Sequence, residues 1–203
     1  MPEKLVFEHT LEGLFIRGLA GQMTPVLRER LRTVGVDLDR KLQPAYGFDV
    51  WCSAVRVSAR LLHADLPDEV ALARLGERMV DGYRATLLGR ALFGVLQLIG
   101  PRRGVSRAQQ MFRSGNNYTQ TRMTDLSPTS LELWMNEAGF IRSFTQGALL
   151  AGLRATGAAD PRVEVHAFTD ADVTYRVSWN DTDAGTRLRT STPGDGASRG
   201  PLR

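Results

Sequence analysis

The spacing of apolar residues changes just past the middle of this chain, and that change limits the fold more than any other feature. In residues 1–113 apolar side chains recur three and four positions apart, as Leu27, Leu31 and Val34 do, which is the spacing of one helix face. Beyond residue 118 the period falls to two, which is typical of strands with one buried face. The chain is therefore expected to be an α+β protein in which a helical half precedes a sheet.

Helical signals divide the first half into several segments. We expect helices at 11–19, 25–34, 49–61, 67–83, 86–99 and 106–113, with a short strand or extended lead-in at 5–7 and a loop at 44–47. Thr24 and Pro25 are typical of a helix start, and Gly35 is typical of a helix end. The segment 86–99 is almost entirely apolar, so we expect it to be a central, well-buried helix.

Two hairpins around one helix are expected in the second half. Leu131, Leu133 and Met135 alternate with Glu132, Trp134 and Asn136, and strand spacing also covers 118–125, 163–167 and 173–179. The expected turns are the Ser-Pro-Thr sequence at 127–129 and the region of Asp170, and helical spacing at 140–156 ends at Gly157. This pattern predicts a four-stranded antiparallel sheet of β-β-α-β-β order, packed against the helical half.

The composition changes near residue 180. We expect residues 1–179 to form a single domain of the ligand-binding type. From residue 180 to 203 Thr, Ser, Gly, Pro, Asp and Arg dominate, and Leu188 and Leu202 are the only large apolar residues. A segment this polar cannot bury enough apolar surface to offset the entropy of ordering it, so 180–203 is expected to be a disordered tail.

The residue content argues against several kinds of chemistry. Cys52 is the only cysteine, so neither an intramolecular disulfide nor a metal site built on several cysteines can form. The three histidines, His9, His63 and His166, have no neighbours at metal-ligand spacing. The chain contains no phosphate-binding glycine loop, dinucleotide fingerprint, nucleophile elbow or zinc-protease motif. We therefore expect a non-enzymatic protein with no catalytic residues, no metal and no cofactor.

The charge pattern argues against nucleic-acid binding, and no apolar stretch is long enough for a membrane span. The chain has 26 Lys and Arg against 22 Asp and Glu, and these charges are interleaved rather than gathered on one face. One local basic group, made of Arg102, Arg103, Arg107 and Arg113, leaves nucleic-acid binding as the last-ranked hypothesis beside an ordinary solvated face. The longest apolar stretch, 91–100, is about half the length that a membrane helix needs. We expect a cytoplasmic protein with no membrane span.

The densest polar stretch runs from Phe112 to Thr119. Gly115, Asn116 and Asn117 can adopt left-handed backbone angles and expose N–H groups to an anion, and Arg113 can add donors. The alternative is a helix end followed by a turn, in which the asparagines bind nearby backbone groups. The sequence leaves both interpretations open.

A family resemblance rests on short motifs spread along residues 5–179. They are VFE (6–8), EGLF (12–15), RLR (30–32), PAY (44–46), GY (82–83), TLLGR (86–90), FRSGNNYT (112–119), ELWMNE (132–137) and TYRVSW (174–179). Together they resemble a large paralogous family of myxobacterial proteins of unknown function, domain of unknown function 2378. The resemblance implies no activity, substrate or partner.

A more distant likeness follows from the order of elements and from the stretch between Leu131 and residue 177. In these features the chain is similar to the group that contains 4-vinyl reductase domains, haem–nitric-oxide-binding domains and transport-particle subunits. That likeness implies an α/β fold with an internal apolar pocket, and frequent dimerisation. The haem version requires a histidine in a helix before the sheet and a Tyr-x-Ser-x-Arg strand. Neither is present, since no histidine lies between His63 and His166 and the matching strand has Leu133, Met135 and Glu137. The residues therefore argue against haem of that type.

The leading hypothesis is a sensory domain that binds a small apolar or amphipathic molecule between the helical half and the sheet. The expected apolar walls are Phe93, Leu96, Phe112 and Trp134, and the expected polar contacts are Arg113, Asn116, Asn117, Tyr118 and Arg122. Binding would change a homodimer interface or an interface with an unknown protein partner. The alternative is a dimerisation or protein-interaction module with a filled core and an exposed apolar helix face.

Overall fold

Four strands of the second half form one antiparallel sheet in the computed structural model, which describes residues 2–137 and 139–180. These strands are β3 (Thr121–Ser127), β4 (Ser130–Met135), β5 (Ala159–Phe168) and β6 (Val173–Asn180), in the spatial order β3-β4-β6-β5. Both predicted hairpins are confirmed, and β4 pairs with β6 to join them into the predicted sheet. The last described strand includes Asn180, and the rest of the predicted tail lies outside the described residues.

One face of the sheet is apolar and covered, because alternate residues of a strand point to the same side. The buried side chains on this face are Leu131, Leu133, Met135, Val173, Tyr175, Val177 and Trp179. Helix α7 (Arg142–Ala155), which follows a 3₁₀ turn at Gly139–Ile141, packs against them. The helix predicted at 140–156 is therefore confirmed. Gly157 ends it with a φ of +82°, a backbone angle that glycine adopts without strain.

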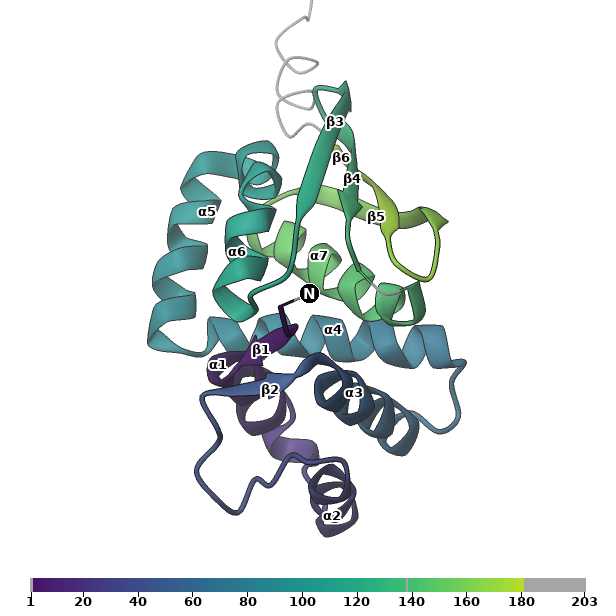
Figure 1. The fold of residues 1–203 in the computed structure, drawn as a ribbon. Helices are drawn as coiled ribbons and strands as arrows, with labels where there is room; N and C mark the ends of the chain where they lie inside the picture. Colours follow the sequence, from purple (N-terminus) through teal and green to yellow (C-terminus); the bar gives the residue numbers. More distant parts are fainter. Residues whose placement is uncertain (1, 138, 181–203) are drawn as a thin grey trace, which may run out of the picture.

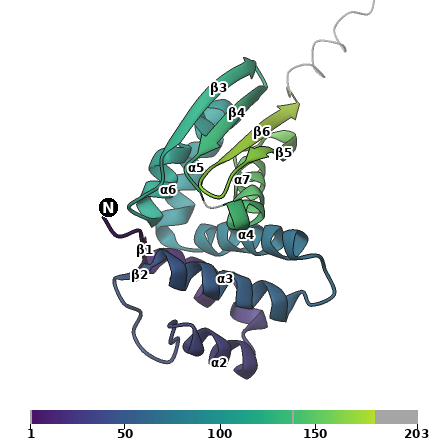
Figure 2. The ribbon, with the colours of Figure 1, turned by 45° about the vertical axis from the view of Figure 1, so that its right-hand side comes forward.

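Helix α4 (Asp68–Arg84) crosses α7 on the side away from the sheet, as Figure 2 shows. The two backbones approach very closely at this crossing. A Cβ atom on Gly76 would lie 1.9 Å from the carbonyl oxygen of Phe144, and one on Gly147 would lie 1.9 Å from that of Ala73. Both positions therefore require glycine, and the α4–α7 pair forms a close-packed layer between the sheet and the rest of the helical half.

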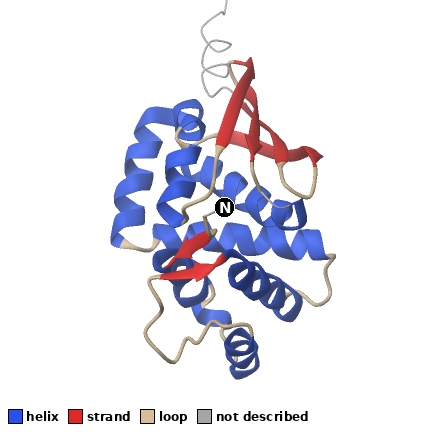
Figure 3. Ribbon diagram, in the orientation of Figure 1, coloured by secondary structure: helices blue, strands red, loops and turns tan. Residues whose placement is uncertain are grey.

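The N-terminal segments pack on the other side of α4. They are β1 (Leu5–Phe7), α1 (Glu8–Leu11), a π-helical segment (Glu12–Gly18), a 3₁₀ turn (Ala20–Gln22), α2 (Pro25–Thr33), β2 (Ala45–Gly47) and α3 (Phe48–Leu62). Strand β1 pairs antiparallel with β2, so the predicted loop at 44–47 contains a strand. A strand of three residues is too short to show a period of two. Figure 3 shows this small sheet apart from the four-stranded one.

The prediction that 86–99 is a well-buried helix is wrong. Helix α5 (Leu87–Ser106) lies at the left edge of the molecule in Figure 1, with Leu87 80% exposed and Leu98 88% exposed. An apolar helix can be enclosed by protein or can present an unpartnered face, and composition alone does not distinguish the two. Helix α5 continues past the predicted end at residue 99, with a kink at Gly100, whose φ is +78°, and α6 (Ala108–Gly115) follows. Within the described ranges, no helix has both the length and the hydropathy to cross a membrane.

Candidate functional site

A cavity of about 180 Å³ lies between the helical half and the buried face of the sheet. Helices α1, α4, α5, α6 and α7 supply most of its wall, and α3 and β6 contribute single residues. The wall is mostly apolar, and the space is many times the roughly 10–15 Å³ that one water molecule requires. Among the predicted ligand-binding residues, Phe93, Leu96, Phe112, Asn116 and Tyr118 line this cavity.

Three other predicted ligand-binding residues lie at a separate surface hollow. Arg113, Arg122 and Trp134 border it together with Gln109 and neighbouring polar residues. Trp134 alternates with the buried residues of β4 and therefore points to the opposite face of the sheet, where the guanidinium carbon of Arg122 lies 3.9 Å from its ring centroid. The structure thus divides eight of the nine predicted residues between two places, and these three do not reach the interior. The ninth, Asn117, lines neither hollow.

The turn after α6 is held by its two asparagines. Oδ1 of Asn116 accepts hydrogen bonds from the backbone N–H groups of Tyr118 (3.1 Å) and Thr119 (2.9 Å). Oδ1 of Asn117 accepts from the N–H of Leu5 (2.8 Å), and its Nδ2 donates to the carbonyl of Glu3 (2.9 Å). These bonds match the helix-end interpretation, in which the asparagines satisfy backbone groups, and they fasten β1 to the start of the sheet domain.

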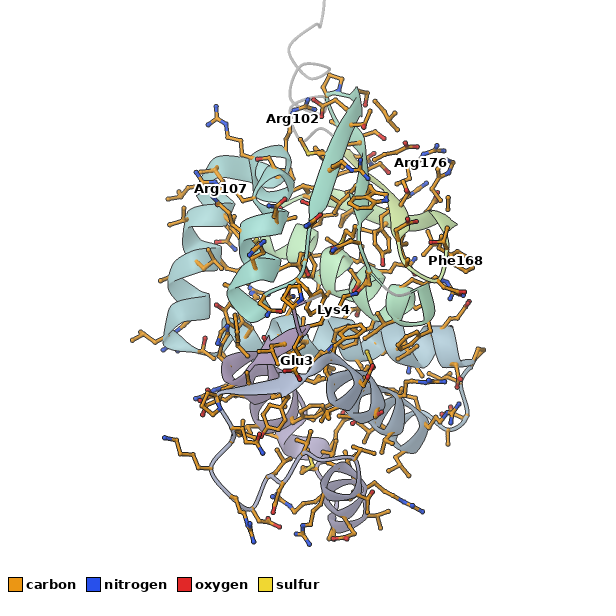
Figure 4. The ribbon with its side chains drawn as sticks, in the orientation of Figure 1. Glu3, Lys4, Arg102, Arg107, Phe168 and Arg176 are labelled. Atoms are coloured by element: carbon orange, nitrogen blue, oxygen red, sulfur yellow. The ribbon has the colours of Figure 1, made fainter. Side chains whose placement is uncertain are left out.

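The predicted basic group is not one surface. Arg102 forms an ion pair with Asp125 (2.6 Å) and donates to the carbonyls of Ser127 (3.0 Å) and Pro128 (3.2 Å), so it ties α5 to the β3–β4 turn. Figure 4 shows Arg102 near that turn and Arg107 apart from it on the helical side. The guanidinium group of Arg102 is therefore engaged in contacts within the protein.

The most unusual polar group of the cavity is the carboxyl group of Glu137, which is not among the predicted site residues. Glu137 follows β4 and continues the inward phase of Leu131, Leu133 and Met135, which is the signal that could have identified it. The hydroxyl of Thr145 donates to its Oε1, and the hydroxyl of Tyr175 lies 2.9 Å from its Oε2. Both partners are uncharged groups.

Burial determines the proton affinity of this carboxyl group. The residue retains some accessible surface, but its carboxyl group is enclosed by protein. Removal from water raises the pKa of Glu137 from 4.5 to about 7, although hydrogen bonds from Thr145 and Tyr175 act in the opposite direction. Tyr175 has one hydroxyl proton but lies 2.9 Å from both Glu137 and the carbonyl of Arg142. A protonated Glu137 donating to Tyr175 allows both short distances to be hydrogen bonds.

Aromatic rings form part of the same wall. Trp51 of α3 and Phe144 of α7 both line the cavity and pack edge to face, with ring centroids 5.6 Å apart. Cys52 beside Trp51 is buried, and this burial, followed by the charge of Glu137, raises the pKa of its thiol to about 12. Cys52 is therefore a small buried residue and not a reactive thiol. Within the described residues, no group of His, Cys, Asp and Glu side chains is arranged to hold a metal ion.

The sequence of this domain matches a family model described as "Protein of unknown function (DUF2378)" over residues 4–180. The chain belongs to the DUF2378 family. The family resemblance inferred from the motifs is therefore confirmed. The comparison with curated proteins found no match.

Solved structures with a similar fold are H-NOX domains. An Fe(II) unliganded H-NOX protein from K. algicida has a TM-score of 0.60 and 12% identity, and the match covers 85% of this chain and 95% of that one. An oxygen-binding H-NOX domain related to soluble guanylate cyclases has a TM-score of 0.57 and 12% identity, with coverages of 85% and 94%. An Fe(II) H-NOX protein from S. oneidensis gives the same four values. These likenesses confirm the predicted α+β fold and its distant similarity to the fold of haem–nitric-oxide-binding domains.

The residues of this cavity do not fit haem. Haem needs an axial ligand and partners for its two propionates. Helices α5 and α6, which precede the sheet, contain no histidine, and the one histidine that lines the cavity is His9 of α1. Among the described residues that line the cavity, none is a lysine or an arginine, and a carboxyl group, Glu137, faces the space instead. The two negatively charged propionates of haem would therefore face another acid in this cavity, where they require cationic partners.

Proposed function

We propose that this protein is a non-enzymatic sensory domain that binds a small, largely apolar molecule in the cavity between its helical half and its sheet. The observation that carries the proposal is the cavity itself, an apolar hollow bordered by a few polar groups. Small-molecule sites usually have this composition, with apolar walls for affinity and a few polar groups for orientation. The H-NOX-like fold supports the proposal as a likeness of architecture only, because fold does not determine function.

Two opposite walls of the cavity, α5 and α6 on one side and α7 on the other, make few contacts with each other, which suits a sensor. Helices α5 and α6 contribute Phe93, Leu96 and Phe112 to one wall, while α7 contributes Phe144 to another. A ligand that fills the space contacts both sides and favours one arrangement of the walls over others. The proposed output is a change at an interface with a second copy or with another protein.

A cavity-filling variant tests this function. Gly152 lines the cavity, and a Cβ there would meet nothing within 4 Å, so Gly152→Leu fills space without a backbone clash. Gly94→Leu is the matched control, because Gly94 is an exposed helix glycine that is equally open. Native mass spectrometry of the purified protein and thermal-shift screening of small alkyl and aryl compounds are the assays. We expect a bound or stabilising compound with wild type and Gly94→Leu that is lost with Gly152→Leu. If the screen finds no bound or stabilising compound, the proposed function is refuted.

A second candidate function is dimerisation through α5. Its exposed face carries Leu87, Val95 and Leu98, which are 80%, 48% and 88% exposed, at positions that share one side of a helix. Contiguous apolar surface of this kind marks many protein interaction sites. Sedimentation velocity with Leu98→Glu tests it, and Val26→Glu, on the 61% exposed Val26 of α2, is the control. A monomeric wild-type protein at every concentration would rule out the dimer. The alternative hypothesis from the sequence combined dimerisation with a filled core, and the presence of the cavity argues against a filled core.

A further inference from the structure

The carboxyl group of Glu137 has no cationic partner within the described part of the chain. Its hydrogen-bond partners are the hydroxyls of Thr145 and Tyr175, and the described ion pairs do not include it. The nearby Arg142 turns away, since its guanidinium group pairs with Glu69 and stacks 4.1 Å over the ring of Phe168 at the right-hand end of the sheet in Figure 4. A carboxylate enclosed in this way is left without the counter-charge that buried acids usually have.

The acceptor capacity of this carboxyl group is only partly used. Two carboxylate oxygens can accept about four hydrogen bonds. Each oxygen of Glu137 has one partner, and the side chain borders the cavity, so acceptor positions remain on the cavity side. A ligand with an N–H donor and a positive charge would complete the hydrogen bonding and neutralise the charge at once.

The aromatic residues around the cavity favour the same kind of ligand. Trp51, Phe144 and Tyr118 line it, and the faces of such rings attract cations. Burial, followed by the charge of Glu137, raises the pKa values of Tyr118 and Cys52, so the carboxyl group is within electrostatic reach of this aromatic side of the wall. Lys4 already lies over the ring of Tyr118 at 5.6 Å, but Lys4 is not among the residues that line the cavity. Trp51 and Phe144 line the cavity as well, and among the described residues no cation lies over either ring.

We propose that the cavity selects an amphipathic amine, whose ammonium group binds the carboxylate of Glu137 and whose hydrocarbon part packs against Phe93, Leu96 and the other apolar walls. This inference rests on the proposed ligand-binding function. Carboxylates and phosphates are rejected by the same geometry, because the described lining offers them an acid and no lysine or arginine. A neutral alcohol gains the apolar contacts but not the charge-assisted hydrogen bond.

A series of three ligands that differ only in the polar group tests the inference. Hexylamine, 1-hexanol and hexanoate share one hydrocarbon chain, and their binding to wild-type protein at pH 8 is measured by titration calorimetry and thermal shift. We expect hexylamine to bind about tenfold more tightly than 1-hexanol, since hydrogen bonds to charged groups are worth more than neutral ones. We expect hexanoate to bind more weakly than either.

Two variants of β4 and its extension connect the preference to one side chain. Glu137→Gln keeps the shape but removes the charge, so the advantage of hexylamine over 1-hexanol should disappear. Glu132→Gln is the matched control, because Glu132 lies on the opposite face of the same strand and pairs with Arg176 (3.0 Å) on the outer side of the sheet, where Figure 4 shows Arg176. The control should keep the preference.

The possible results separate this inference from the proposed function. If 1-hexanol or hexanoate binds wild type as well as hexylamine does, and Gly152→Leu abolishes that binding, the cavity is a ligand site but the amine preference is wrong. If Glu137→Gln is folded by circular dichroism and retains the full preference for hexylamine, the assignment to Glu137 is wrong. If none of the three compounds binds wild type, the amine inference is overturned. Failure of the broader screen as well overturns the proposed function. The wild-type series does not depend on whether any variant folds.

Discussion

Replacement of Glu137 by glutamine should remove the loss of stability that ionisation of this carboxyl group causes as the pH rises. The folded protein raises the pKa of this carboxyl group from 4.5 to about 7 because it is removed from water. Between those two pH values the folded state holds a proton that the unfolded state has lost, so the free energy of unfolding falls as the pH rises. This is opposite in sign to the usual contribution of a salt-bridged carboxylate.

The size of the effect follows from the shift. One pKa unit corresponds to about 1.4 kcal/mol, so Glu137 lowers the free energy of unfolding of the wild-type protein by up to about 3 kcal/mol above pH 8, relative to pH 4.5 and below. Glutamine has the shape of the protonated acid and no charge at any pH. The difference in unfolding free energy between Glu137→Gln and wild type should therefore increase in favour of the variant by about 2–3 kcal/mol between pH 5 and pH 8.5.

Urea denaturation of the two proteins at several pH values between 5 and 8.5 measures this difference. Other titrating groups cancel in the comparison, among them His63, whose pKa is lowered chiefly by burial. Glu164→Gln, an exposed acid on β5, is the control and should change the profile by less than about 0.5 kcal/mol. Parallel stability profiles for Glu137→Gln and wild type would refute the reasoning, because they would mean that the carboxyl group titrates as in water.

Three further outcomes follow from the packing. Gly76→Ala should lower the free energy of unfolding by about 1–3 kcal/mol or prevent folding, because its Cβ would lie 1.9 Å from the Phe144 carbonyl oxygen; Gly94→Ala, with nothing within 4 Å, should stabilise by up to about 1 kcal/mol in the same urea titration. Asn117→Ala should cost about 1–3 kcal/mol and expose the amide of β1 to hydrogen exchange, because two hydrogen bonds between its side chain and the backbone are lost. Cys52 should react with a thiol reagent at pH 8 only as fast as the protein unfolds, since its pKa is about 12 and it is buried.

The sheet could be predicted because its two central strands, β4 and β6, have one covered face. Leu131, Leu133 and Met135 repeat at intervals of two, and this repeat survives in the structure as a continuous buried row opposite Val177 and Val173. β2 could not be predicted in this way, since Ala45–Gly47 is too short to repeat anything and exists only because β1 lies beside it. The repeat of apolar residues therefore identifies strands and helices that are long enough to show it. It misses short strands that form only by pairing with a segment distant in sequence.

The burial of α5 and the location of the site illustrate a different limit. The apolar residues of α5 predicted an enclosed helix, but only the side with Phe93 and Leu96 meets the rest of the protein. Arg122 and Trp134 were predicted to face the ligand together with Tyr118, but they point to the opposite face of the sheet. Closeness in sequence does not determine which face of the sheet a strand residue occupies. The alternation of side chains along the strand determines it.

The same alternation along β4 also accounts for the position of Glu137 in the cavity wall. Glu137 continues the inward row of β4 by one step, so a single acid stands where the pattern requires an apolar side chain. A chain under selection for stability alone would lose such an acid, because a buried charge without a partner costs several kcal/mol that an apolar residue of similar size avoids. Its presence is easier to explain if something that enters the cavity supplies the missing charge. The H-NOX-like frame positions the hollow, and the side chain at residue 137 then decides the sign of charge that the hollow accepts.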